Sequence, residues 1–436
     1  MGWLTGIVLV VVVLAVLVVV LKPRDRGGAY PPYFAMLNQT LKNARVGRAR
    51  ILIDQERLDH NLAVIHGNIP SPQHYRIVVK SIPCVELLRY IKARIGTNKF
   101  MVVHEPFLRV ILENFEPGID ILLGKPLPVF ACEEFFNDIP AALSERAQKE
   151  IQWLVDTDVR MQEYLDFASQ KGLTLRVSVE LDIGLHRGGV DSFEQLDAIL
   201  KIIQANPDRL IFSGYMGYDG HVAAAPGIFT SARQAALAEF AENMAVYQGY
   251  IEHGRQHFPK LFSGNLAFNS GGSSTYSLFG QAPFITDVGI GGAVLRPASY
   301  PALFLGDLQP AEFVATPMIK LWKGAVIPYI EGLAGFLRWW NPNDQCSFGI
   351  YGGSWAGAIV APPELHAQML TSTDPANENL VTNQSILNGS RKVGWGMGDF
   401  AFYYPKQSDA MFQFEDILLI RDGRVTGCWK VFDVRY

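Results

Sequence analysis

Residues 75–104 read YRIVVKSIPCVELLRYIKARIGTNKFMVVH, and this stretch decides the fold. Tyr75–Lys80 and Phe100–His104 are short apolar runs rich in β-branched residues, which favours strands. Between them, Val85–Ile95 places apolar residues at helical spacing and predicts an amphipathic helix. Two strands joined by a helix form a parallel crossover, so this stretch predicts the repeating unit of an α/β protein.

The same alternation continues along the chain. Further strands are predicted at Ile119–Leu123, Ile151–Asp156, Leu173–Asp182, Leu210–His221 and Leu266–Ser270. Further helices are predicted at Phe107–Phe115, Asp158–Gln170, Ser192–Ile203 and Ser231–Phe258. Seven or eight such units match the length of a (β/α)8 TIM-type barrel. A doubly wound sheet is the alternative, but no GxGxxG follows the first strand.

The texture changes from Phe284 onward, where Gly, Pro and β-branched residues replace helical periodicity. Short strands are predicted at Ile285–Val294, Phe313–Ile319, Cys346–Tyr351, Ala356–Ala361 and Ile417–Arg421, with a hairpin turn at Arg421–Arg424. The expected organisation is an anchor (1–26), a linker (27–48), a barrel (49–283) and a mostly β domain (284–436).

The N-terminal stretch predicts a single membrane-spanning helix. Residues 4–21 read LTGIVLVVVVLAVLVVVL and contain no charge. Eighteen residues at 1.5 Å each make a helix of about 27 Å, close to the thickness of a bilayer core. Lys22, Arg24 and Arg26 follow, which favours a cytoplasmic body. The alternative is an odd or uncleaved signal peptide with an exported body.

The composition excludes several classes of function. Hydrophobic residues make up 49% and charged residues 18%, which is typical of a folded globular protein. The formal net charge of −4 and the lack of a basic stripe argue against nucleic acid as a partner. The four cysteines are far apart without a CxxC pair, which argues against a zinc knuckle or a disulfide framework.

The candidate nucleophile is Lys80. Active sites of β/α barrels lie at the C-terminal ends of the strands, and Lys80 follows the β-branched run Ile77–Val79. A lysine in a partly dry barrel mouth can act as a Schiff-base nucleophile. The alternative is an ordinary solvated lysine at a strand end.

Three later strand ends also contain chemical groups. Arg187 lies among glycines in ELDIGLHRGGV (180–190), and GYDGH (217–221) brings together a phenol, a carboxylate and an imidazole. Tyr218 and His221 are therefore acid/base candidates. The loop NSGGSSTY (269–276) has two glycines and several hydroxyls, which suits a phosphate; a flexible Ser/Gly loop is the alternative.

In order and spacing these motifs resemble the fold-type III pyridoxal-phosphate enzymes, in the branch of D-threonine aldolases and D-serine dehydratases, with alanine racemases more distant. The resemblance covers residues 49–436. It rests on ILIDQERLDHNL (51–62), the Lys80 strand, ELDIGLHRGGV, GYDGH, NSGGSSTY and PKQSDA (405–410).

The resemblance implies pyridoxal phosphate as the cofactor and a role for each matching residue. Lys80 would form the Schiff base with the cofactor aldehyde. Arg187 would approach the pyridine nitrogen, while His221 and Tyr218 would face the cofactor or the substrate. The phosphate would be held by the loop of Asn269, Gly271, Gly272, Ser273, Ser274, Thr275 and Tyr276.

The C-terminal motif departs from the pattern of this branch, in which a His-x-Cys or His-x-Asp pair binds a divalent metal. Here Asp409 keeps one ligand position, but Gln407 replaces the histidine. A neutral amide is a far weaker ligand than imidazole for zinc or manganese. A divalent metal is therefore doubtful, although a weak oxygen-only site stays open.

The expected function is that of a lyase acting on a D-amino acid with a β-hydroxyl group. The alternatives are an amino-acid racemase and a non-catalytic, membrane-tethered protein that binds pyridoxal phosphate. A small amino acid is the expected partner, and the resemblance also implies a possible homodimer.

Overall fold

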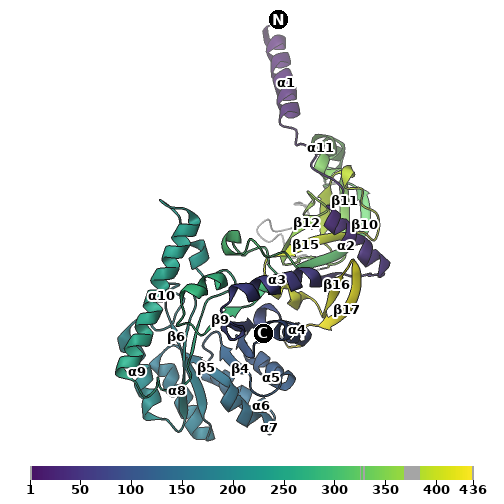
Figure 1. Ribbon diagram of the computed structural model, residues 1–436. Helices are drawn as coiled ribbons and strands as arrows, with labels where there is room; N and C mark the ends of the chain where they lie inside the picture. The colour runs from purple at the N-terminus through teal and green to yellow at the C-terminus, as the bar shows by residue number, and fades with distance from the viewer. Residues whose placement is uncertain (1, 325, 328, 368–382, 435–436) are drawn as a thin grey trace. The chain divides into compact units, whose positions relative to one another are not determined.

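The computed structural model describes residues 2–324, 326–327, 329–367 and 383–434, and they form two compact units (Figure 1). One unit contains Glu56–Ala311, Gln407–Glu415 and the segment from Trp429. The other contains the N-terminal segment through Gln55, Glu312–Lys406 and Asp416–Cys428. Two C-terminal segments thus join the first unit, so the units are not the consecutive blocks that the sequence predicts.

The first unit is a closed barrel of eight parallel strands, which confirms the predicted fold. The strands, in barrel order, are β2 (Tyr75–Val78), β3 (Lys99–Val102), β4 (Asp120–Leu123), β5 (Ile151–Val155), β6 (Leu175–Leu181), β7 (Leu210–Gly217), β8 (Ala267–Ser270) and β9 (Asp287–Ile290). All eight run in one direction, so their C-terminal ends meet at one rim.

The eighth barrel strand was predicted as part of the β domain. The structure pairs β9 with β8 through Asn269↔Asp287 and with β2 through Ile77↔Ile290, so it closes the barrel. A short 3₁₀ turn (Gly292–Val294) follows β9 in place of a long helix. Because no helical pattern follows β9 in the sequence, this strand resembled the strands of the C-terminal β domain.

Helices follow most barrel strands: α4 (Val85–Ile95), α5 (Glu105–Asn114), α6 (Val129–Asp138), α7 (Ala141–Glu150), α8 (Asp158–Lys171), α9 (Phe193–Ala205) and α10 (Ala232–His257); α3 (Gln55–Asn68) precedes them. Figure 1 shows α8, α9 and α10 along the outside of the strands. Their starts are set by local sequence. Thr157 and Ser192 cap α8 and α9, and Ser231 forms a capping box with Gln234 at α10.

A buried ion network occupies the barrel interior near the starts of the strands. The guanidinium of Arg76, which is fully buried, donates to Asp287 at 2.6 Å and to Asp120 at 2.6 Å. Arg176 and Lys99 add further contacts to these two carboxylates, at 3.1 Å each. The network lies away from the C-terminal rim, where β/α barrels have their active sites.

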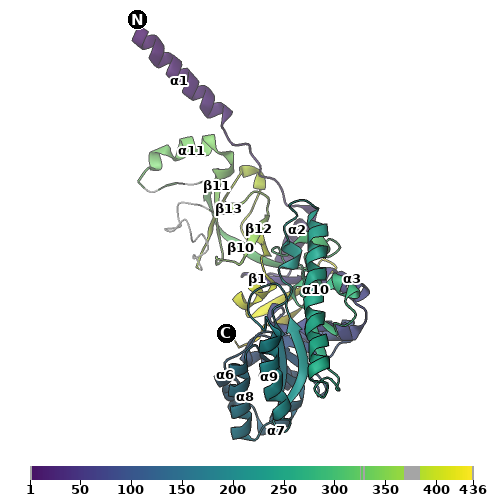
Figure 2. The ribbon, with the colours of Figure 1, turned by 90° about the vertical axis from the view of Figure 1, so that its left-hand side faces the viewer.

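The second unit is built on a nine-stranded sheet, which confirms the predicted β-rich domain (Figure 2). Its strands are β1 (Arg50–Asp54), β10 (Glu312–Lys323), β11 (Cys346–Ile350), β12 (Gly357–Ala361), β13 (His366–Ala367), β14 (Ile386–Gly389), β15 (Phe400–Pro405), β16 (Asp416–Arg421) and β17 (Arg424–Lys430). The turn between β16 and β17 has positive φ at Asp422 and Gly423, as the hairpin prediction requires. Three helices also belong to this unit: α1 (Gly2–Val20), α2 (Pro32–Asn43), inside the predicted linker, and α11 (Ala334–Trp340).

The predicted membrane span over residues 4–21 is corrected by the structure. The apolar run lies in α1, which has 19 residues. Across the described part of the chain, no helix reaches both the length and the apolarity of a span. The single-pass membrane localisation, which rested on that span, is therefore wrong.

Candidate active site

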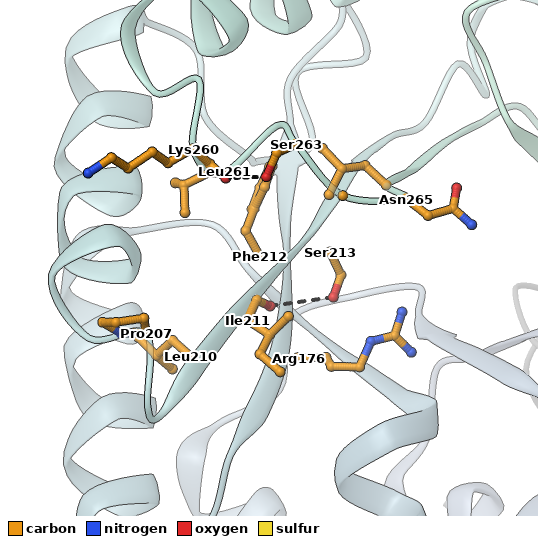
Figure 3. Close-up of a pocket in the computed structure, with 12 residues that line it drawn as sticks. Arg176, Pro207, Leu210, Ile211, Phe212, Ser213, Lys260, Leu261, Ser263 and Asn265 are labelled. Atoms are coloured by element: carbon orange, nitrogen blue, oxygen red, sulfur yellow. Dashed lines mark hydrogen bonds between the residues drawn. The ribbon is translucent and has the colours of Figure 1, made fainter.

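Two of the hollows in the barrel unit lie at opposite ends of its strands. Figure 3 shows the smaller one, about 350 Å³, beside Arg176, Leu210 and Ile211 at the starts of β6 and β7. Its lining contains no carboxylate, histidine or cysteine, and Arg176 is already paired with Asp120. Because β/α barrels perform their chemistry at the other rim, this hollow is not the candidate site.

The other hollow is a cavity of about 590 Å³ at the C-terminal ends of the strands. A volume of this size suits a small cofactor with its substrate. Its lining brings together predicted residues from distant parts of the sequence: Lys80, Arg187, Tyr218, Asn269, Gly271, Gly272, Ser273, Gln407 and Asp409. The barrel therefore gathers at one rim what the sequence distributes over more than three hundred positions.

Lys80 lies two residues beyond the end of β2, in a 3₁₀ turn (Val79–Ser81). Val79 and Ser81 are buried on either side of it, whereas Lys80 itself is exposed and lines the cavity. The buried neighbours fix the backbone while the amine is free to reach a bound molecule. This is the placement that a lysine nucleophile needs.

Arg187 and Tyr218 form a stacked pair across two strand ends. The guanidinium carbon of Arg187 lies 4.8 Å from the centroid of the Tyr218 ring, within the range of a cation–π contact. Glu180 approaches Arg187 at 3.8 Å. Burial raises the pKa of Glu180 to about 7, while the charge of Arg187 acts in the opposite direction. Arg187 is thus held from two sides.

The glycine loop after β8 comes close to its neighbours in a way that only glycine permits. Gly271 has a φ of +78°, and a β-carbon there would lie 2.5 Å from the Phe279 ring. A β-carbon on Gly272 would lie 2.9 Å from the Tyr218 ring. The loop backbone itself, without side chains at these two positions, therefore forms this wall of the cavity.

Main-chain donors converge beside this loop. The N–H groups of Gly291 and Ala293 both donate to the Ser273 hydroxyl oxygen, at 3.2 and 3.1 Å. Two N–H groups aimed at one oxygen form the kind of concavity that binds anions. Together with the glycine wall and Lys80, these donors fit a cofactor that has a phosphate and an aldehyde.

Other predicted residues lie behind the cavity wall. Thr275 is buried, and its hydroxyl accepts a hydrogen bond from the Gly272 N–H at 3.3 Å. Ser274 and Tyr276 do not line the cavity, and Tyr276 lines a separate hollow. Within this loop, Gly271–Ser273 therefore line the cavity, and the residues that follow lie behind them.

His221 points away from the cavity. Its Nε2 lies 3.0 Å from a Glu239 carboxylate oxygen and 3.0 Å from the Asn243 amide nitrogen, both on α10. Its neighbour Asp219 is fully buried, and neither carboxylate oxygen has a hydrogen-bond partner among the described residues. Burial raises the pKa of Asp219 to about 6, against the effects of the Thr275 hydroxyl and His221.

The C-terminal motif lines the cavity but does not form a metal site. The Gln407 amide donates to the Ser299 hydroxyl at 2.7 Å. Within the described ranges, no group of three or more His, Cys, Asp or Glu side chains could hold a metal. A single carboxylate, Asp409, does not fit a divalent metal.

Four further residues of the cavity were missed by the sequence analysis: His104, Lys125, Gly291 and Tyr300. His104 and Lys125 follow β3 and β4 by two residues, just as Lys80 follows β2. That repeated offset is a signal that could have found them. Gly291 lies in the run GIGG (289–292), whose glycines resemble those of the loop at 271–272.

The barrel sequence matches a known protein family. Residues 53–257 match the family described as alanine racemase, N-terminal domain. No curated protein matches the chain. Among solved structures, D-threonine aldolase from Filomicrobium marinum is 17% identical with a TM-score of 0.65, and the match covers 88% of this chain and 97% of that one.

Two other solved structures are similar over comparable lengths. D-threo-3-hydroxyaspartate dehydratase from Delftia sp. HT23 is 15% identical with a TM-score of 0.64, covering 89% of this chain and 98% of that one. Alanine racemase from Bacillus anthracis is 14% identical with a TM-score of 0.62, covering 88% and 97%. At these identities, the structural similarity establishes a shared fold and no common activity.

Proposed function

Because residues 53–257 match the alanine racemase N-terminal domain family, we propose that the chain is a pyridoxal-phosphate-dependent lyase acting on a D-amino acid with a β-hydroxyl group. One observation supports this most directly: Lys80, Tyr218 and the loop Gly271–Ser273 line one cavity at the C-terminal rim. The D-threonine aldolase and the D-threo-3-hydroxyaspartate dehydratase have similar folds.

Each cavity residue would have a defined task toward the cofactor. The Lys80 amine would hold the aldehyde carbon, and the backbone of Gly271–Ser273 with the N–H of Gly291 would hold the phosphate. Arg187, fixed by its contacts with Tyr218 and Glu180, would lie toward the pyridine nitrogen and discourage its protonation. When bound, pyridoxal phosphate supplies a ring that stabilises negative charge at the substrate α-carbon.

The proton transfers would be performed by groups of this chain. The Lys80 amine would take or return a proton at the substrate α-carbon. Burial raises the pKa of the Tyr218 hydroxyl, so this group stays protonated at neutral pH and can donate a hydrogen bond. His221 is hydrogen-bonded to side chains of α10. It would therefore orient the loop that contains Tyr218 rather than contact the substrate.

A racemase is the second candidate function. Racemisation needs a second proton carrier on the opposite face of the bound amino acid, and Tyr300 lines the same cavity as Lys80. A lyase instead needs assistance at the β-hydroxyl group, for which Gln407 and Asp409 are available. The two functions differ in their products.

The test is a substrate panel on the full chain loaded with pyridoxal phosphate. D- and L-serine, D- and L-threonine, and D- and L-alanine are incubated with the enzyme, and the products are identified by mass spectrometry and chiral chromatography. The lyase proposal expects an aldehyde or a keto acid from a D-hydroxy amino acid, and no product from Lys80→Ala. Interconversion of the alanines would identify a racemase, and loaded protein that converts none of them would reject catalysis on amino acids.

A further inference from the structure

Lys125 is a second lysine in the cavity, and the proposed function does not use it. It follows Gly124 at the end of β4, its side chain is exposed, and it lines the cavity. Within the part of the chain that the structure describes, the Lys125 side chain has no ion pair or hydrogen bond. A free ammonium group in a ligand-sized cavity is available to a bound anion.

His104 lies between the two lysines of this rim. Strands β2, β3 and β4 are adjacent in the barrel, with Val78 opposite Met101 and Val102 opposite Leu123. The residues that follow these strands therefore project from neighbouring positions. Burial lowers the pKa of His104 to about 4, and the charges of Lys125 and Lys80 add to this effect. The imidazole is consequently neutral at physiological pH and can donate one hydrogen bond.

The charges of the cavity favour an anion at this place. Its lining contains three cations, Lys80, Lys125 and Arg187, and one carboxylate, Asp409. Lys80 is assigned to the cofactor aldehyde, and Arg187 already contacts Tyr218 and Glu180. Lys125 is the cation that remains, and a cavity of one predominant charge attracts ligands of the opposite sign.

We propose that Lys125 and His104 form a carboxylate-binding subsite that positions the substrate next to Lys80. The ammonium would supply charge and the neutral imidazole a directed hydrogen bond. The carboxylate has two possible sources: the α-carboxylate present in every amino acid, or a second carboxylate on an acidic side chain. This inference rests on the proposed function, because Lys80 must hold the cofactor for the subsite to face the reacting carbon.

The test measures anion binding without turnover. The full chain is loaded with pyridoxal phosphate, and binding of acetate and of succinate is followed by calorimetry for the wild type, Lys125→Ala and Lys125→Arg. Loss of a charge-assisted contact is expected to weaken binding roughly tenfold to a hundredfold in Lys125→Ala, whereas Lys125→Arg keeps most of the affinity. The control is Lys201→Ala, which removes a lysine that is 70% exposed on α9, outside the cavity.

The outcomes distinguish an α-carboxylate from a side-chain carboxylate, and a failure of the subsite from a failure of the proposed function. Equal weakening for acetate and succinate assigns the subsite to a single carboxylate, and weakening for succinate alone assigns it to a second one. The subsite is rejected when the wild type binds neither anion, or when Lys125→Ala binds both like the wild type. The visible absorbance of the cofactor on Lys80 is recorded in the same samples, so failure of cofactor attachment is distinguished from failure of the subsite.

Discussion

The guanidinium of Arg187 stacks on the ring of Tyr218 at 4.8 Å, although the two residues come from the ends of different barrel strands. The contact links the loop after β6 to the loop after β7. Gly272 lies against the same Tyr218 ring, so one aromatic side chain contacts both the arginine and the glycine loop. Tyr218 would therefore organise the proposed cofactor site in addition to any role in proton transfer.

Tyr218→Ala is expected to weaken binding of pyridoxal phosphate by about 1–2 kcal/mol, which is the value of a partly desolvated cation–π contact. Tyr218→Phe keeps the ring and is expected to bind the cofactor like the wild type while losing activity. Titration of the cofactor, followed by absorbance, measures the affinities. Equal affinity in the alanine variant and the wild type would show that the stacked pair does not support the cofactor.

Gly291→Ala is expected to weaken cofactor binding about tenfold, the loss of roughly one charge-assisted hydrogen bond. The added methyl group would lie 2.8 Å from the Ser81 hydroxyl, so the loop must shift and carry its N–H away from the anion concavity. Gly280→Ala is the matched control, because no atom lies within 4 Å of its β-carbon position. An unchanged affinity for Gly291→Ala would exclude this loop from the phosphate site.

Asp219→Asn is expected to stabilise the protein at neutral pH. Burial raises the pKa of Asp219 from its ordinary value of 3.8 to about 6. The folded state therefore binds more protons than the unfolded state between these values, and stability falls as pH rises through that range. Above pH 6 the cost is about 3 kcal/mol, from 1.36 kcal/mol per pKa unit. Urea unfolding at several pH values should show a gain above pH 6 that disappears below about pH 4; a gain that is independent of pH would contradict this account.

Arg76→Met is expected to destabilise the barrel by about 3–5 kcal/mol, because it removes the fully buried cation that bridges Asp287 and Asp120 and leaves them only the partly exposed Lys99 and Arg176. Arg109→Met is the control: it breaks a surface pair with Glu113 and is expected to cost less than about 1 kcal/mol. Urea unfolding midpoints measure both variants. Similar losses in the two would show that the interior network contributes no more than a surface pair.

Local pattern was sufficient to predict the barrel and the strand ends that contribute Lys80, Arg187, Tyr218 and the loop at Gly271. Hydrophobic periodicity identifies strands and helices, and the parallel topology then brings the strand ends to one rim. The same reasoning failed for β9 because its local signal, a following helix, is absent. It also failed for residues 4–21, where the apolarity and the length of the run predicted a membrane span.

Contacts between distant segments could not be predicted from one sequence. The network of Arg76, Asp120 and Asp287 depends on which strands are neighbours and in what register. The orientation of His221 toward α10, away from the cavity, likewise depends on how the helix packs. Lys125 shares with Lys80 the offset of two residues beyond a strand, but only the structure shows that both residues line one cavity.

The most direct test of the central claim is the site of cofactor attachment. The full chain is mixed with pyridoxal phosphate, reduced with borohydride and digested, and the modified peptide is identified by mass spectrometry. We predict one modified lysine, Lys80, and a visible absorbance band that is absent from Lys80→Ala. Attachment at Lys125 or at any other lysine, or a band that persists in Lys80→Ala, would contradict the account.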